Sequence, residues 1–192
     1  MTDFERALTF TLKQEGGYAN VAGDNGGETY RGISRNFHSG WPGWIQIDAL
    51  KQNVTGIKLL AHLIDSTLGQ DAAFQADIAA FYKQEYWDAA ACDALPWPVN
   101  CVTFDCAVNS GTGAARKLLQ LALGFKGNDV DGKIGAHTLA AIARLDPVSL
   151  ALAAIEERKE YDKEIAQKNP TQQKFLINWL NRIQSLKEII NV

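Results

Sequence analysis

The sequence predicts a mainly α-helical fold with two lobes and a glycine-rich loop region that holds a small hairpin. Three observations indicate this fold class. Apolar residues recur with helical spacing over most of the chain, glycines gather between residues 18 and 53, and a Pro96-Trp97-Pro98 run interrupts the helical pattern. Because proline disfavours helix at the residue before it, the lobes are predicted at 1–95 and 99–192.

The composition is ordinary for a soluble globular chain, with 46% hydrophobic and 21% charged residues among 192. The formal net charge is −3 without a long basic run, so the charge gives no indication of nucleic-acid binding. No segment approaches the roughly 18 apolar residues of a membrane-spanning helix. The N-terminus lacks the pattern of a signal peptide. We therefore expect a protein that is synthesised in the cytoplasm without stable membrane insertion.

The first predicted helix starts at a capping box, Thr2-x-x-Glu5. One stripe of its surface recurs at i, i+3, i+4, i+7 and i+8, with residues Phe4, Ala7, Leu8, Thr11 and Leu12. Glu15 continues the stripe, about 20° from Phe4 at roughly 100° per residue. Gly16-Gly17 then ends the helix. The pattern predicts an inward-facing carboxylate in the last helical turn.

Glu15 is the sharpest candidate for chemistry. Burial among apolar side chains and the partial negative charge at a helix C-terminus both favour the protonated form of a carboxyl group. A glycosidase needs a carboxylic acid that stays protonated near neutral pH, because that acid protonates the leaving oxygen. The alternative is an ordinary glutamate whose carboxylate reaches water from the helix end.

The rest of the chain divides into loops and helices. Residues 18–53 are predicted to be loops with a hairpin near Glu28 to Ile33, because glycines punctuate them and no helical period persists. Helical periodicity or caps then predict helices over 55–68, 78–89, 100–109, 112–123, 147–168 and 175–190. Asp146-Pro147 is an N-cap followed by proline at the first helical position.

No metal or cofactor is expected. The three cysteines are Cys92, Cys101 and Cys106, of which the last two lie on one predicted helix. We interpret them as buried structural thiols, since the scattered histidines add no metal-ligand spacing. The segment that starts at Gly127 resembles a calcium loop only in part. It lacks an oxygen ligand at its first position and a glutamate at its twelfth, so we interpret it as a turn.

The residues after Glu15 carry a family motif. Glu15-Gly-Gly-Tyr18, followed by Asp24 and Thr29, resembles glycoside hydrolase family 108, the phage and prophage N-acetylmuramidases whose catalytic Glu opens a Glu-Gly-Gly-Tyr motif. The Glu, Asp, Thr order is also similar to that of phage-type lysozymes. In those enzymes the Asp helps to activate water and the Thr helps to position it. One residue fewer separates Asp24 from Thr29 than separates the corresponding pair there.

The resemblance extends over most of the chain. Glu85-Tyr86-Trp87-Asp88 looks like the family's motif before the lobe boundary. Further motifs look like its C-terminal half, commonly described as a predicted peptidoglycan-binding region: Asp105, Ala107 to Gly111, Leu119-Gln120 and Asp131-Gly132-x-x-Gly135-x-x-Thr138. The resemblance implies a lysozyme-like catalytic lobe at 1–95 and a helical, peptidoglycan-binding lobe at 99–192.

The resemblance also implies a reaction, hydrolysis of the β-1,4 bond between N-acetylmuramic acid and N-acetylglucosamine in bacterial peptidoglycan. Glu15 is then the general acid, Asp24 orients or deprotonates water, and Thr29 holds that water. Two rival second carboxylates are Glu28 and Asp105. The segment from Asp24 to Gly27 is also typical of a simple turn. A wall-lysing endolysin would need a holin-like pore or a secretion system to reach the periplasmic or extracellular wall.

Substrate contacts are predicted in both lobes. Five aromatic side chains offer flat faces to sugar rings, although such residues more often belong to cores: Tyr18, Tyr30, Trp41, Trp44 and Trp87. Asp105 and Asn109 share a helix face at i, i+4, and with Ser110 they are candidates for hydrogen bonds to the sugar. The alternative is a polar pair that braces the loop at Gly111.

Two other functions stay open. A lytic transglycosylase needs only one glutamate and releases an anhydro-sugar. Asp24 and Thr29 argue against it, because that reaction needs no positioned water. A non-catalytic wall-binding or secretion-accessory protein could keep the fold, and the presence of Glu15 argues against this function.

Overall fold

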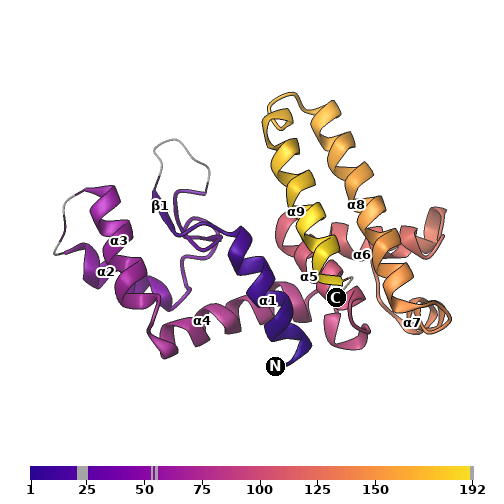
Figure 1. Ribbon diagram of the computed structural model, residues 1–192, viewed down its shortest axis with the longest axis horizontal. Helices are drawn as coiled ribbons and strands as arrows, with labels where there is room; N and C mark the ends of the chain where they lie inside the picture. Colours follow the sequence, from indigo (N-terminus) through magenta and orange to yellow (C-terminus); the bar gives the residue numbers. More distant parts are fainter. Residues whose placement is uncertain (21–25, 53, 55, 191–192) are drawn as a thin grey trace. The chain divides into compact units, whose positions relative to one another are not determined.

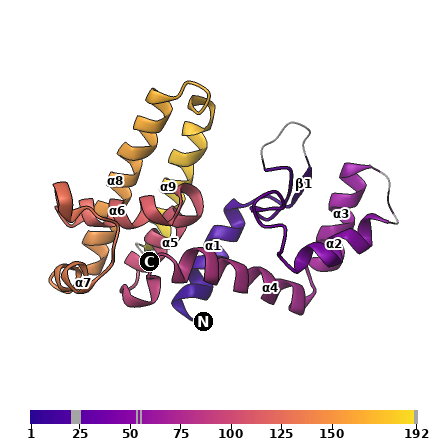
Figure 2. The ribbon, with the colours of Figure 1, turned by 180° about the vertical axis from the view of Figure 1, so that it is seen from behind.

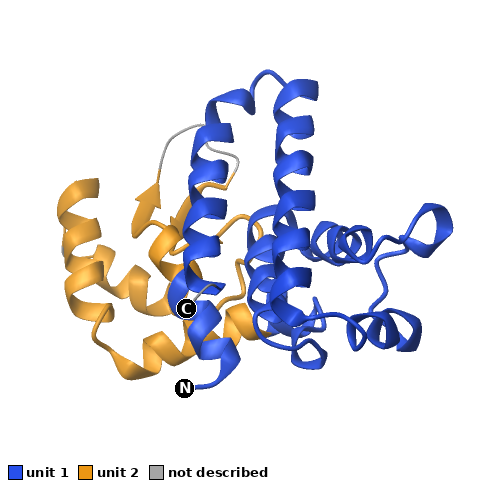
Figure 3. Ribbon diagram, turned by 45° about the vertical axis from the view of Figure 1, so that its right-hand side comes forward, with its two compact units in different colours: residues 1–10, 84–192 blue, residues 11–83 orange. Residues whose placement is uncertain are grey.

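The structure, a computed structural model, describes residues 1–20, 26–52, 54 and 56–190. The chain forms two compact units (Figure 3). Unit 1 comprises residues 1–10 and 84–192, and unit 2 comprises residues 11–83. Residues 84–95, which the sequence assigns to the first lobe, belong to unit 1, where the Trp87 ring packs 5.6 Å from that of Phe104. The lobe limits 1–95 and 99–192 stay a prediction.

Helix α1 (Asp3–Gln14) confirms the first predicted element. Its capping box is formed in both directions: the Thr2 amide donates to Glu5 at 2.7 Å, and the Glu5 amide donates to the Thr2 hydroxyl at 3.2 Å. The inward stripe is buried at Ala7, Leu8 and Thr11. The Glu15 amide still donates to the Thr11 carbonyl, at 3.2 Å, so Glu15 directly follows the last helical turn.

In the part of unit 2 that the structure describes, a small antiparallel sheet is accompanied by helices (Figure 1). The strands β1 (Tyr18–Asn20), β2 (Glu28–Tyr30) and β3 (Ile33–Ser34) lie in sequence order, and β2 and β3 confirm the predicted hairpin. The helices are α2 (Gly43–Lys51), α3 (Ile57–Leu68) and α4 (Ala72–Tyr82). The prediction of loops throughout 18–53 is wrong at α2, which buries Trp44 and Ile47 on one face.

Unit 1 is helical. After the π-helix η1 (Lys83–Asp88) and the 3-10 turn η2 (Cys92–Ala94) come α5 (Val99–Ser110) and α6 (Thr112–Ala122). A loop with the short η3 (Gly127–Asp129) leads to α7 (Ala136–Ile142). Then come α8 (Pro147–Lys168), η4 (Gln173–Phe175) and α9 (Leu176–Ile190). Figure 1 and Figure 2 show α8 and α9 side by side, while α5 is buried along most of its length.

Two finer predictions for unit 1 are confirmed. The Asp146 side chain caps α8 by accepting from the Ser149 amide at 2.8 Å, with Pro147 in the first turn. All three cysteines are free and buried. Burial raises the pKa of Cys101 to about 12 and that of Cys106 to about 11.

Among the described residues, no single helix is long and apolar enough to cross a membrane, although α7 and α8 together, bent by 115°, meet the length and composition criteria.

Candidate active site

The Glu15 carboxyl group lies against the turn between β2 and β3. A β-carbon placed on Gly32 would stand 2.9 Å from Glu15 Oε2 and 3.3 Å from its Cδ. The missing side chain of Gly32 therefore gives the carboxyl group its place beside the backbone. Glu15 itself is half-buried, so the group keeps access to solvent.

Tyr82, the last residue of α4, also lies against this turn. Its side chain is buried, and its hydroxyl donates to the Arg31 carbonyl at 2.6 Å. The same β-carbon on Gly32 would stand 2.7 Å from the Tyr82 hydroxyl and 2.9 Å from Glu15 Oε2, so these two oxygens lie no more than 5.6 Å apart (2.7 plus 2.9). The end of α1, the β2–β3 turn and the end of α4 thus meet within unit 2.

The turn has the backbone that two-residue hairpins favour. Tyr30 pairs with Ile33, and the two residues between them both have positive φ, +44° at Arg31 and +79° at Gly32. This is the pattern of a type I′ turn, in which glycine is preferred because positive φ is unfavourable for other residues. The Arg31 amide donates to the Gly17 carbonyl at 3.4 Å, which ties the turn to the segment that follows Glu15.

Of the two residues predicted to activate and position water, the structure describes Thr29 alone. Asp24 lies outside the described residues. Thr29 sits in the middle of β2, paired with Ala19 and Ser34, and is half-exposed. Side chains alternate across a strand. Thr29 therefore points to the side opposite the buried Tyr30, where its hydroxyl donates to the Gly27 carbonyl at 3.3 Å.

Glu28, a rival second carboxylate, takes part in two ion pairs and a hydrogen bond. It is buried, accepts from the Tyr18 hydroxyl at 2.7 Å, and pairs with Arg35 at 2.7 Å and with Lys51. Burial and the hydrogen bond to Glu28 raise the pKa of Tyr18. Both Glu28 oxygens are neutralised by cations, so this carboxylate anchors the sheet rather than serving as a free base.

The aromatic residues proposed for sugar stacking lie in the core instead. All five are at most 8% exposed: Tyr18, Tyr30, Trp41, Trp44 and Trp87. Four of the rings pack on one another or on phenylalanines, as Tyr30 does on Phe74 at 5.5 Å, and the Tyr18 hydroxyl donates to Glu28. None of these side chains presents an open face to a sugar ring. The commoner role of aromatic residues as core holds for these five.

The three substrate-binding candidates on α5 differ in their exposure to solvent. Asp105 is completely buried, pairing with Arg158 at 2.7 Å and with Arg182 at 2.8 Å. Burial alone would raise the pKa of Asp105, but the charges and hydrogen bonds of the two arginines outweigh it and lower that pKa. Asp105 is therefore not placed to bind a sugar. Asn109 and Ser110 remain half-exposed, with the Asn109 amide donating to the Ser110 hydroxyl at 3.3 Å.

Sequence reasoning missed two residues of the Glu15 site. Tyr82 lies within the helix predicted over 78–89, and its periodic pattern indicated no role in the site. Gly32 lies within the predicted hairpin and was likewise given no role. A glycine two residues after a strand tyrosine, in a predicted hairpin, is a signal for positive φ, but only the fold shows which side chain uses the space.

A glutamate at the end of the first helix, beside a small antiparallel sheet in a mainly helical protein, is the arrangement expected of lysozyme-like glycoside hydrolases. The model of glycosyl hydrolase 108 matches residues 8–111, and the model of a predicted peptidoglycan domain matches residues 114–184. The structure of Brucella abortus SagA is 26% identical, with 97% of this chain and 92% of that chain covered and a TM-score of 0.68. No curated protein matches the sequence.

The chain therefore belongs to glycosyl hydrolase family 108. It is a glycoside hydrolase that acts on peptidoglycan, as the resemblance of its motifs implied, and its mainly helical fold is lysozyme-like.

Proposed function

We propose that the protein hydrolyses the β-1,4 bond between N-acetylmuramic acid and N-acetylglucosamine, with Glu15 as general acid. The observation that carries this proposal is the placement of the Glu15 carboxyl group beside the Gly32 turn, half-exposed and within 5.6 Å (2.7 plus 2.9) of the Tyr82 hydroxyl. A carboxyl group held against backbone, and still open to solvent, can reach a glycosidic oxygen.

The proposed step transfers the Glu15 proton to the bridging oxygen as the bond to the sugar carbon breaks. Positive charge develops on the muramic acid ring, and water adds to that carbon. The proton lost by the water goes to Asp24, and Thr29 holds the water. The half-exposed position of Thr29 in β2 supports its role, while the role of Asp24 rests on the family motif alone.

The location of the substrate leads to a second proposal. Peptidoglycan lies outside the cytoplasmic membrane, so we propose that the enzyme acts in the periplasmic or extracellular wall after passing a holin-like pore or a secretion system. Release of muropeptides by intact cells that produce the enzyme with and without such a pore tests this proposal. Equal release in both would contradict it.

Digestion of purified peptidoglycan, followed by mass spectrometry of the products, tests the reaction. We expect muropeptides that carry a reducing muramic acid end, one water heavier than the anhydro product of a transglycosylase. A variant with Glu15→Gln should release none above background. Anhydro-muropeptides would assign the transglycosylase reaction, and wall binding without any released muropeptide would assign the non-catalytic function.

A further inference from the structure

Unit 1 has an open pocket along one face of α6, with a volume of about 520 Å³. Its lining includes Ala114, Lys117, Leu118, Leu121, Val130 and Tyr161. The four α6 residues recur at i, i+3, i+4 and i+7 and so form one helix face. Val130 comes from the following loop and Tyr161 from α8. The volume lies within the range of small-ligand sites.

The loop that forms one wall of the pocket is fixed by a buried glutamine. Gln120 is 1% exposed, and its side-chain oxygen accepts from the Gly132 amide at 2.7 Å. Its side-chain nitrogen donates to Asp131 at 2.8 Å and to the Lys133 carbonyl at 3.1 Å. These are the Leu119-Gln120 and Asp131-Gly132 motifs of the sequence. Their hydrogen bonds hold the segment that directly follows Val130.

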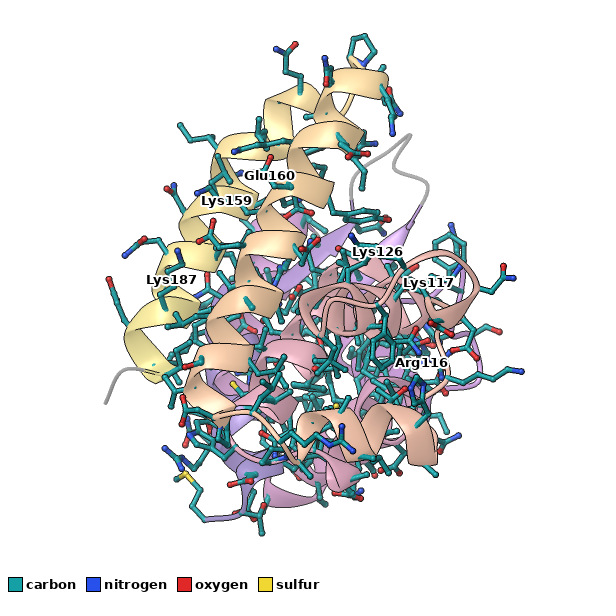
Figure 4. All side chains as sticks on the ribbon, turned by 90° about the vertical axis from the view of Figure 1, so that its right-hand side faces the viewer. Arg116, Lys117, Lys126, Lys159, Glu160 and Lys187 are labelled. Atoms are coloured by element: carbon teal, nitrogen blue, oxygen red, sulfur yellow. The ribbon has the colours of Figure 1, made fainter. Side chains whose placement is uncertain are left out.

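Lys117 supplies the pocket's charge. Its aliphatic stem lies on Gly132, where an added β-carbon would stand 3.4 Å from Lys117 Cγ. In the part of the chain that the structure describes, no ion pair is recorded for Lys117, in contrast to Lys159, which pairs with Glu156 on α8. Figure 4 labels Lys117 beside the loop after α6, with Lys159 and Glu160 on α8.

The lining favours a peptide over a sugar. It holds no carboxylate or amide side chain, and its polar side-chain groups are the Lys117 ammonium and the Tyr161 hydroxyl. It offers aliphatic surface from Leu118, Leu121 and Val130, with Leu121 still 38% exposed, beside one ammonium group. Such a surface fits small apolar side chains next to a carboxylate.

We infer that this pocket binds the peptide stem of peptidoglycan, with alanine methyl groups on the aliphatic wall and a stem carboxylate paired with Lys117. The inference rests on the proposed function only in taking the wall as target. The match of residues 114–184 to a predicted peptidoglycan domain covers every lining residue named here. Binding of the stem would hold the full enzyme on peptide-bearing wall near its substrate bonds.

Calorimetry of the full chain with the free tetrapeptide L-Ala–γ-D-Glu–diaminopimelate–D-Ala tests the inference. We expect binding that Lys117→Ala weakens about tenfold, since a charge-assisted hydrogen bond is lost. Ala114→Phe, which fills the pocket from a half-exposed position, should weaken it at least as much. The matched control is Lys163→Ala, an exposed lysine of α8 that pairs with Glu160 and should leave binding unchanged.

Three results would overturn the inference: no binding of the tetrapeptide to the wild type, equal binding by all variants, or pocket-dependent binding of an N-acetylglucosamine trisaccharide in place of the peptide. Circular dichroism verifies that each variant is folded. The failure of the proposed acid is distinguishable, because the tetrapeptide contains no glycosidic bond. Muropeptide release by Glu15→Gln would reject that acid and leave tetrapeptide binding unaffected.

Discussion

Glu15 in unit 2 and Asp105 in unit 1 carry the same functional group in opposite surroundings. The Glu15 carboxyl is half-exposed and lies beside the backbone of Gly32 and near the Tyr82 hydroxyl. The Asp105 carboxylate is 0% exposed and bonded to two guanidinium groups. The proton transfer proposed for Glu15 needs a setting of the first kind, with access to a bound substrate. A carboxyl in the second setting is held ionised, and its removal leaves the two buried guanidinium groups without a compensating negative charge.

The largest expected effect is on activity. Glu15→Gln keeps the size of the side chain but removes the transferable proton, so wall lysis should fall by on the order of 10²–10⁴-fold or more. Turbidity of a wall suspension measures the loss, and thermal unfolding should show little change. The matched control, Glu188→Gln, alters an exposed glutamate of α9 and should lyse walls normally. Near-normal lysis by folded Glu15→Gln would remove Glu15 from the mechanism.

Asp105→Asn should instead lower the stability of the fold. It leaves Arg158 and Arg182 without their carboxylate inside unit 1, and breaking a buried pair costs about 3–5 kcal/mol of unfolding free energy. Urea unfolding measures this loss. Glu160→Gln, which removes only an exposed pair with Lys163, should cost less than about 1 kcal/mol. If Asp105→Asn unfolds like the wild type and yet loses lysis, Asp105 has a catalytic rather than a structural role.

Gly32→Ala should affect activity more than stability. The added methyl group would stand 2.7 Å from the Tyr82 hydroxyl and 2.9 Å from Glu15 Oε2, at a φ of +79°. We expect lysis to fall by about 10²-fold, because small displacements of a catalytic group have effects of this size. The backbone strain should cost on the order of 1–3 kcal/mol. Gly40→Ala, at a glycine with open space around its Cα, is the control and should behave as the wild type. Full activity in Gly32→Ala would show that Glu15 does not depend on this turn.

The smallest expected effect is that of low pH on the unfolding free energy. The pKa of Asp105 is lowered, so its stabilisation is fully present above the unfolded value of about 3.9 and is lost as the pH falls through the folded pKa. Burial raises the pKa of Asp162, which acts in the opposite sense: its contribution is present at low pH and is lost as the pH rises. The unfolding free energy of the wild type should drop below about pH 4, and that of Asp105→Asn should drop less. Parallel curves for the two proteins would contradict this assignment.

Local patterns predicted much of the fold. The capping box at Thr2, the buried stripe of α1, the hairpin after Glu28 and the cap at Asp146 all depend on residues close in sequence. Helix α2 was missed because it is short and stands among glycines that favour loops. Its two buried side chains, Trp44 and Ile47, beside the buried Gly43, give too few repeats for a periodic signal.

The site was predicted only in part, for the same physical reason. Glu15 could be found because its own helix places it on a buried stripe. The position of Tyr82 beside the turn depends on a contact with Arg31 across 51 residues, and the arginines of Asp105 lie 53 and 77 residues away from it. No local period encodes such pairs. Interpreting Asp105 as a sugar ligand was reasonable from its helix face, but the burial of that face came from α8 and α9.

The three buried thiols give the enzyme a built-in measure of local unfolding. Thiol reagents attack the thiolate, and burial both excludes them and raises the pKa of Cys101 and Cys106. All three cysteines lie in unit 1, and residues 11–83 contain none. The rate of labelling by a colourless thiol reagent therefore reports how often unit 1 opens, without any signal from unit 2. A ligand that binds folded unit 1 stabilises it and should therefore slow this labelling.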